Sequence, residues 1–302
     1  MQRFLIMAIC GLAAQLVDGS LGMAYGLTST TLLLGWGLSP VTASASIHLV
    51  EVGTTLIAGL SHWRFGNVDW RTVAWLALPG GGGAFVGALV LISLPISLAA
   101  PWIASFLICL GIYVLFRFSF GRTKTVLVRP VSRRILAPLG FGAGFFDAAG
   151  GSGWGPIATP SLLSSGRMQP RKVIGTVDTS EFVVAICASA GFFIALNRSS
   201  VALPVVAALL FGGMLAAPLA AWLVRYLHPR ILGSAVGGMI VMMNSHVLMR
   251  ELDVAGDVRM LIYLGLGTFW AVTFIWTLLA VRADRPKVAE LATQDKRVML
   301  GD

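Results

Sequence analysis

Two glutamates and their polar neighbours lie inside long apolar runs, where ionisable side chains are costly. Glu51 and Glu181 each lie about ten residues into such a run, which at 1.5 Å per residue brings both near the bilayer centre. His48 and Asp178 lie three positions earlier, on the same helical faces, and a carboxylate beside an imidazole can exchange protons. An intramembrane charge is by default a functional hypothesis. The alternative is that these residues pair with one another to lock helices together.

Two glycine-containing segments offer a second kind of chemistry, DGSLGMAYG at 18–26 and DAAGGSGWG at 147–155. Glycine permits tight turns and the close approach of a ligand. A helix that restarts after such a break presents free N–H groups and partial positive charge, which suits a small anion. The glycines otherwise only pack helices closely, as small residues do in membranes. Asp18 and Asp147 either cap the restarting helices or line a pathway.

The composition indicates what must position these residues. Of 302 residues, 57% are hydrophobic and only 12% are charged, whereas soluble domains carry about 25% charged residues. The net charge of +9 resides in short loops between apolar runs, as the positive-inside rule requires. The sequence therefore predicts a multi-pass membrane protein in a lipid bilayer, with no nucleic-acid partner. No cofactor is expected, and the chain has no Walker-type loop for ATP.

The chain repeats itself. Residues 11–26 align with 140–155, so that Asp18 meets Asp147, and after one inserted residue Glu51 meets Glu181. We predict an all-α polytopic membrane protein of two inverted repeats, each a re-entrant hairpin followed by three transmembrane helices, with one extra C-terminal transmembrane helix. The expected units are the first repeat at 1–118, a cytoplasmic linker at 119–135, the second repeat at 136–249, the extra helix at 250–281 and a cytoplasmic tail at 282–302.

Basic residues set the expected topology. The linker, the tail and the connection after the second hairpin are all rich in arginine and lysine, which places them in the cytoplasm. The second hairpin therefore returns to its own side, and the first enters from the opposite side. Hairpin arms of about 14 residues would reach about 21 Å, a little past mid-membrane. Inverted repeats of this kind are a common plan for secondary transporters.

Three segments resemble a known family: GFGAGFFDAAGGSGWGPIATPSLL at 140–163, QPRKVIGTVDTSE at 169–181 and GNVDW at 66–70. They are similar to the hallmark segments of the sulfite exporter TauE/SafE family, and the resemblance covers residues 5–250. It implies a bacterial inner-membrane permease for sulfite, sulfonates or related organic anions. The first tip departs from the pattern, with GSLGMAYGLTS where more glycines are usual, which leaves the substrate open.

Together these features predict a proton-coupled secondary transporter that exports a small anion between the two tips. The expected substrate-binding residues are Ser20, Gly22, Ser46, Gly151, Ser152, Gly153, Gly155 and Thr176, and the expected proton-coupling or pathway residues are Asp18, His48, Glu51, Asp147, Asp178 and Glu181. No metal site is expected. A passive anion channel and a non-transporting accessory subunit remain alternatives, and a homodimer is left open. An aspartyl protease is disfavoured, because the glycines follow the aspartates instead of preceding them.

Overall fold

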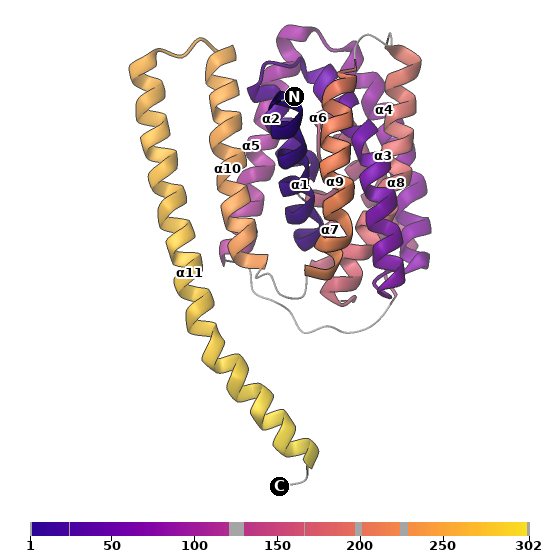
Figure 1. Ribbon diagram of the computed structural model, residues 1–302, viewed down its shortest axis with the longest axis vertical. Coiled ribbons are helices and arrows are strands. Elements are labelled where there is room, and N and C mark those ends of the chain that lie inside the picture. Colours follow the sequence, from indigo (N-terminus) through magenta and orange to yellow (C-terminus); the bar gives the residue numbers. More distant parts are fainter. Residues whose placement is uncertain are drawn as a thin grey trace.

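The computed structural model describes residues 2–23, 25–120, 130–165, 167–196, 201–223 and 229–300, and these form helices and connections without a strand (Figure 1). The helices are α1 (Gln2–Leu21), α2 (Tyr25–Gly35), α3 (Pro40–Arg64), α4 (Trp70–Ser93), α5 (Ile96–Phe120), α6 (Arg133–Gly150), α7 (Trp154–Ser164), α8 (Pro170–Ala195), α9 (Leu203–Leu223), α10 (Pro229–Glu251) and α11 (Gly256–Leu300).

Long apolar helices dominate the fold. Six have the length and hydropathy needed to cross a bilayer: Pro40–Arg64, Trp70–Ser93, Ser97–Phe120, Pro170–Ala195, Leu203–Trp222 and Gly256–Ala283. Large apolar side chains on them point outward, such as Leu78 at 72% and Ile194 at 73% exposure, as lipid-facing residues do. These features bear out the prediction of an all-helical polytopic membrane protein.

Helix α10 is the expected span that does not meet the same hydropathy criterion. Its polar residues explain the difference, because they make hydrogen bonds between helices instead of facing lipid. Ser234 accepts a hydrogen bond from Ser119 of α5 at 3.1 Å, and Asn244 donates to Thr31 of α2 at 2.7 Å. Helix α10 lies between α5 and α11 and packs on both.

The hairpins differ from expectation in the length of their first arms. Helices α1 and α6 contain 20 and 18 residues, and the returning helices α2 and α7 contain 11 each. The first arms are longer than the predicted 14 residues because the helix continues through the Asp-containing part of each tip. It ends only at Gly22 and Gly151, whose φ angles of 65° and 73° stop a right-handed helix.

The helices of the two halves pack in matched pairs. Helix α4 packs along α6, and its counterpart α9 packs along α1, while α3 packs on α8 and α5 on α10. Glycines allow the closest of these approaches. A Cβ atom on Gly83 would lie 2.0 Å from the Phe141 carbonyl oxygen, and one on Gly212 would lie 1.8 Å from that of Ala8. The glycine run of α4 is therefore a helix-packing surface.

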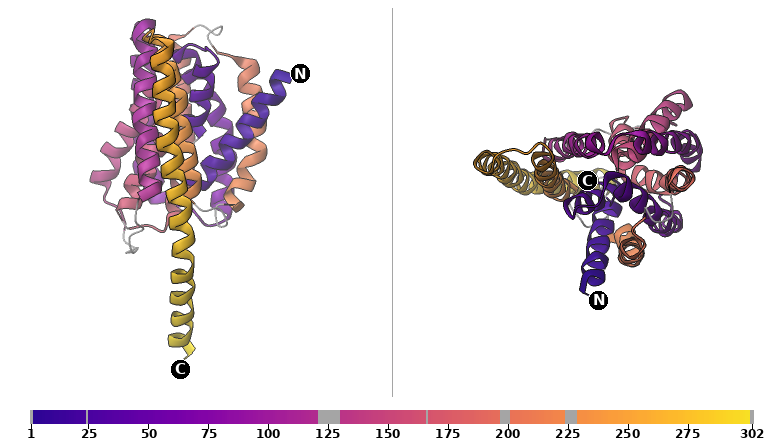
Figure 2. Two further views of the ribbon diagram at one scale, coloured as in Figure 1. Left: turned by 90° about the vertical axis from the view of Figure 1, so that its left-hand side faces the viewer. Right: turned by 90° about the horizontal axis from the view of Figure 1, so that it is seen from above.

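Helix α11 stands apart from the paired arrangement. It packs on α10, where the Trp270 indole N–H donates to the Ser234 carbonyl at 3.2 Å. Its second half extends beyond the ends of the other helices (Figures 1 and 2).

Candidate functional site

An aspartate caps the returning helix of each hairpin. Asp147 Oδ1 accepts hydrogen bonds from the backbone N–H groups of Gly153 at 2.8 Å and Trp154 at 2.9 Å, at the start of α7. Asp18 Oδ1 accepts from the N–H of Tyr25 at 3.1 Å, at the start of α2. Both carboxylates therefore have the geometry of the capping alternative.

This geometry changes the expectation for the second tip. Its N–H groups were expected to be free for a substrate anion, but Gly153 and Trp154 already donate to Asp147. The carboxylate of Asp147 holds the place at the helix N-terminus that an external anion would take. Sequence alone could not distinguish a free N-terminus from one occupied by its own aspartate.

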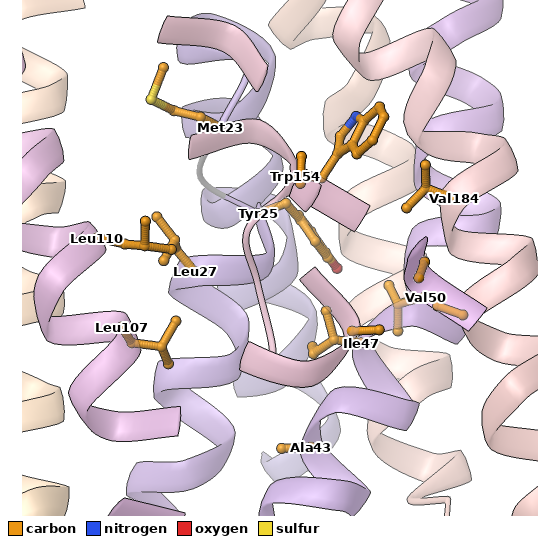
Figure 3. Packing of buried hydrophobic residues seen from close by; sticks show 14 of the residues in the cluster. Met23, Tyr25, Leu27, Ala43, Ile47, Val50, Leu107, Leu110, Trp154 and Val184 are labelled. Carbon is orange, nitrogen blue, oxygen red and sulfur yellow. The ribbon is translucent and has the colours of Figure 1, made fainter. Parts of the chain in front are cut away.

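Reciprocal hydrogen bonds join the two tips. The Thr30 hydroxyl of α2 donates to the carbonyl oxygen of Gly151, and the Thr159 hydroxyl of α7 donates to that of Gly22. The backbones of the two tips also approach closely at Gly155, where a Cβ atom would lie 2.4 Å from Met23 Cα. The first residues of the returning helices, Tyr25 and Trp154, belong to one buried cluster (Figure 3). The tips of the two hairpins therefore form a single unit.

A small polar cradle adjoins this unit. A Cβ atom on Gly26 would lie 2.8 Å from Ser152 Oγ and 2.9 Å from Glu51 Oε1. Glu51 is 2% exposed, and its other oxygen, Oε2, has no hydrogen-bond partner. The side chains of Glu51 and Ser152 thus face the same point beside the start of α2.

Six ionisable residues form two groups of three around the tips. Donor atoms of His48, Glu51 and Asp147 lie within 4.8 Å of one another, and so do those of Asp18, Asp178 and Glu181. Each group takes two residues from a long helix of one half and an aspartate from the hairpin of the other half. All six are buried. The structure thus assembles all of the ionisable residues singled out in the sequence.

The first group contains a buried histidine–aspartate pair. His48 Nε2 lies 3.2 Å from Asp147 Oδ2, and His48 Nδ1 lies 2.8 Å from the Ser44 carbonyl oxygen. The ring of His48 also contacts the ring of Phe192 in α8, with 5.8 Å between centroids.

The second group lies beside His62, a histidine outside the predicted site. His62 Nε2 lies 3.2 Å from Asp178 Oδ2, and Asn67 Nδ2 lies 3.4 Å from His62 Nδ1. His62 was not among the predicted site residues, because it lies near the end of its apolar run. The sequence did contain a signal for its role, because His62 lies about four helical turns after His48 and therefore on the same face of α3.

Two further predicted residues, Ser46 and Thr176, make hydrogen bonds to residues outside the tips. Ser46 accepts from the N–H of Ala202, before α9, at 3.2 Å, and Thr176 accepts from the N–H of Asp69, before α4, at 3.0 Å. These two contacts join helices α3 and α8 to the connections of the opposite half. The side chain of Ser20 lies outside the described part of the chain.

Groups of three such residues can bind metal ions, but several of the donor atoms are already engaged. His48 Nε2 faces Asp147, while Asp147 Oδ1 and Asp18 Oδ1 cap helices. A metal ion would have to displace these contacts, so the donor set fits protons better than it fits a metal.

Comparison with known proteins identifies relatives over most of the chain. A family model described as "Sulfite exporter TauE/SafE" matches residues 7–247. A Bacillus subtilis (strain 168) protein, "Probable membrane transporter protein YtnM", is 50% identical over 280 residues, which cover 91% of this chain and 93% of that protein. No solved structure matches the chain.

Proposed function

We propose, from the premise that this chain belongs to the sulfite exporter TauE/SafE family, that it is a secondary transporter that exports a small anion in exchange with or together with protons. The substrate class is sulfite, a sulfonate or a related organic anion, and the location is the bacterial inner membrane. The observation that carries the proposal is the meeting of two hairpin tips at two buried groups of titratable residues.

The two halves are inverted repeats in this proposal. The reciprocal contacts support it: Thr30 reaches the Gly151 carbonyl as Thr159 reaches that of Gly22, and α4 packs on α6 as α9 packs on α1. Each of these contacts maps onto the other when the halves are exchanged, as a two-fold axis between them requires. Such an axis lies in the membrane plane in inverted-repeat transporters.

The distribution of charge supports the orientation. The connections before α4 and α8 meet at one end of the bundle, where the backbone N–H of Asp69 donates to the Thr176 hydroxyl. Basic residues concentrate at that end: Arg64, Arg71, Arg133, Arg134, Arg167, Arg171 and Lys172. The other end carries Arg250 and Arg259 together with Glu251, Asp253 and Asp257. The basic end is therefore cytoplasmic, and the second hairpin enters from it.

The anion binds between the tips, against Gly22, Gly151, Ser152, Gly153 and Gly155. Hydroxyl and backbone groups must carry the binding, because the ionisable residues grouped there are five carboxyls and a histidine. Protonated carboxyls are neutral and can donate hydrogen bonds, so an anion can enter such a site only together with protons. This requirement links substrate binding to proton binding.

Transport by purified protein in liposomes tests the proposal. Methanesulfonate, sulfite and thiosulfate are loaded in turn, and their movement is followed with and without a pH gradient. We expect at least one of them to move, and a pH gradient to drive it against its own gradient. Movement that only dissipates the anion gradient, whatever the pH gradient, would indicate a channel. Failure of all three in protein that is monodisperse would overturn the anion assignment.

A further inference from the structure

The contact between His48 and Asp147 requires a proton. His48 Nδ1 lies 2.8 Å from the Ser44 carbonyl oxygen, which can only accept, so Nδ1 carries a hydrogen. If Nε2 and Asp147 were both unprotonated, two lone pairs would face each other across 3.2 Å. One additional proton must therefore lie between His48 Nε2 and Asp147 Oδ2, as imidazolium with carboxylate or as imidazole with carboxylic acid.

The position of this proton on Asp147 follows from its other oxygen. Oδ1 accepts two backbone N–H groups, from Gly153 and Trp154, and so cannot itself be a donor toward them. Protonation of the carboxyl falls on Oδ2, which faces His48. A single side chain thus holds the tip of the second hairpin with one oxygen and an exchangeable proton with the other.

The second group does not need an extra proton. The amide of Asn67 donates toward His62 Nδ1, which leaves the hydrogen of a neutral imidazole on Nε2, facing Asp178. His62 Nε2 and both Asp178 oxygens lack a hydrogen-bond partner among the described residues, so their 3.2 Å contact is not a hydrogen bond and requires no shared proton. Of the two buried histidine–aspartate contacts, that of His48 with Asp147 is the one that requires a proton beyond those of a neutral histidine and an ionised aspartate.

We propose that the His48–Asp147 pair is the binding site of the coupling proton, and that the Asp147 carboxylate is an internal competitor of the substrate anion. This deepens the proposed function and rests on it. With the proton on Oδ2, Asp147 is neutral and accepts only weakly from Gly153 and Trp154, so an external anion can replace Oδ1 at the start of α7. Loss of the proton restores the carboxylate, which takes back the N–H groups and expels the anion.

Buried side chains beside the tip support an exchange of anions there. Glu51 Oε2 is unpartnered within the described part of the chain and, when protonated, can donate a hydrogen bond to an anion. Glu51 and Ser152 face the cradle at Gly26, and Ser152 is next to Gly153 in the chain. The ionisable groups near the pair are Glu51 on α3, Asp18 on α1, Tyr25 on α2, and Asp178 and Glu181 on α8. The ring of His48 also packs against Phe192, which carries no charge. Four of these neighbours are carboxyls, which favour retention of the proton by the pair.

Nitrogen-15 NMR of histidine rings tests the proton site directly. The chain has only four histidines, so a protein labelled at histidine gives few ring signals, and His48→Gln identifies the one from His48. We expect His48 Nε2 to show a protonated or proton-sharing signal in the parent. Asp147→Asn keeps an oxygen for the cap but donates its own amide hydrogen to Nε2, so this signal should move to the position of an unprotonated nitrogen.

Asp178→Asn is the matched control, because Asp178 is the partner of the other buried histidine. It should change the signal of His62 and leave that of His48 in place. An unprotonated Nε2 in the parent, or a His48 signal that Asp147→Asn does not move, overturns the proposal. This readout needs no substrate, so it stands apart from failure of the anion assignment.

Transport then tests coupling. Methanesulfonate is the probe, because its sulfonate stays ionised across the working pH range and any pH dependence belongs to the protein. We expect Asp147→Asn and His48→Gln each to lose the uptake driven by a pH gradient. Either variant, folded and still driven as strongly as the parent by the gradient, would show that the coupling proton binds elsewhere.

Discussion

Neighbouring glycines in α4 provide a sharp test of how the two halves are held together. Gly83 faces α6, and a Cβ atom there would lie 2.0 Å from the Phe141 carbonyl oxygen. Gly82 faces outward, with nothing within 4 Å of its Cβ position. Gly83→Ala and Gly82→Ala add the same methyl group to the same helix, one residue apart. The pair therefore separates close packing from intrinsic helix propensity.

The two substitutions are expected to change the free energy of unfolding in opposite directions. Carbon–oxygen contacts settle at about 3.3 Å, so Gly83→Ala must separate α4 from α6 by about 1.3 Å. Overpacking of this kind costs about 1–3 kcal/mol. Gly82→Ala meets no obstacle and gains up to about 1 kcal/mol in helix propensity. We therefore expect the free energies of unfolding of the two variants to differ by about 1–4 kcal/mol.

Equilibrium unfolding of the purified variants in mixed micelles, followed by circular dichroism and checked for reversibility, measures this difference. Gly87→Ala serves as a repeat of the test, because its Cβ atom would lie 2.3 Å from the Phe145 carbonyl oxygen. Equal stability of the Gly82 and Gly83 variants would refute the view that close backbone contact joins α4 to α6. The packing of this glycine run against α6 thus involves Gly83 and Gly87, and not Gly82.

Three further predictions concern the tips and the topology. Glu51→Gln should abolish or strongly alter the pH dependence of methanesulfonate transport in liposomes while the protein stays folded, because glutamine cannot titrate; unchanged pH dependence would assign Glu51 to helix packing. Thr159→Val removes the donor to the Gly22 carbonyl and should lower the unfolding free energy by about 1–3 kcal/mol, and an unchanged value would mean that water or another donor replaces it. In a cysteine-free background, Gln169→Cys should react with an impermeant maleimide only from the cytoplasm and Asp257→Cys only from the opposite side, and labelling of both from one side would contradict the proposed orientation.

Much of the fold was predictable because bilayer physics restricts the choices. Apolar runs of sufficient length must be helices, so the long helices from α3 onward follow from composition and hydropathy. The repeat aligned Asp18 with Asp147 and Glu51 with Glu181, and the structure places all four around the tips. The resemblance to the TauE/SafE family is confirmed by the match over residues 7–247.

The interactions between the tips could not be predicted from the sequence. Which oxygen of Asp147 caps α7 and which faces His48 depends on how two distant segments meet, and no local pattern encodes it. His62 was missed because its position was judged along the chain, whereas its partner Asp178 comes from α8. The lengths of α1 and α6 were underestimated because glycine and aspartate were interpreted as helix breakers, although the helices continue to the glycines with positive φ.

The hydrogen bonds between the two tips have a consequence for biosynthesis. The carbonyl of Gly22 receives its hydrogen bond from Thr159, a residue that leaves the ribosome on the order of 10 s later. During that interval the first half resides in the membrane with an unfinished tip, and it reaches its final form only when α7 arrives. A gene divided within the linker should therefore yield stable protein only when both fragments are made in the same cell, and the first fragment made alone should be a substrate for membrane proteases.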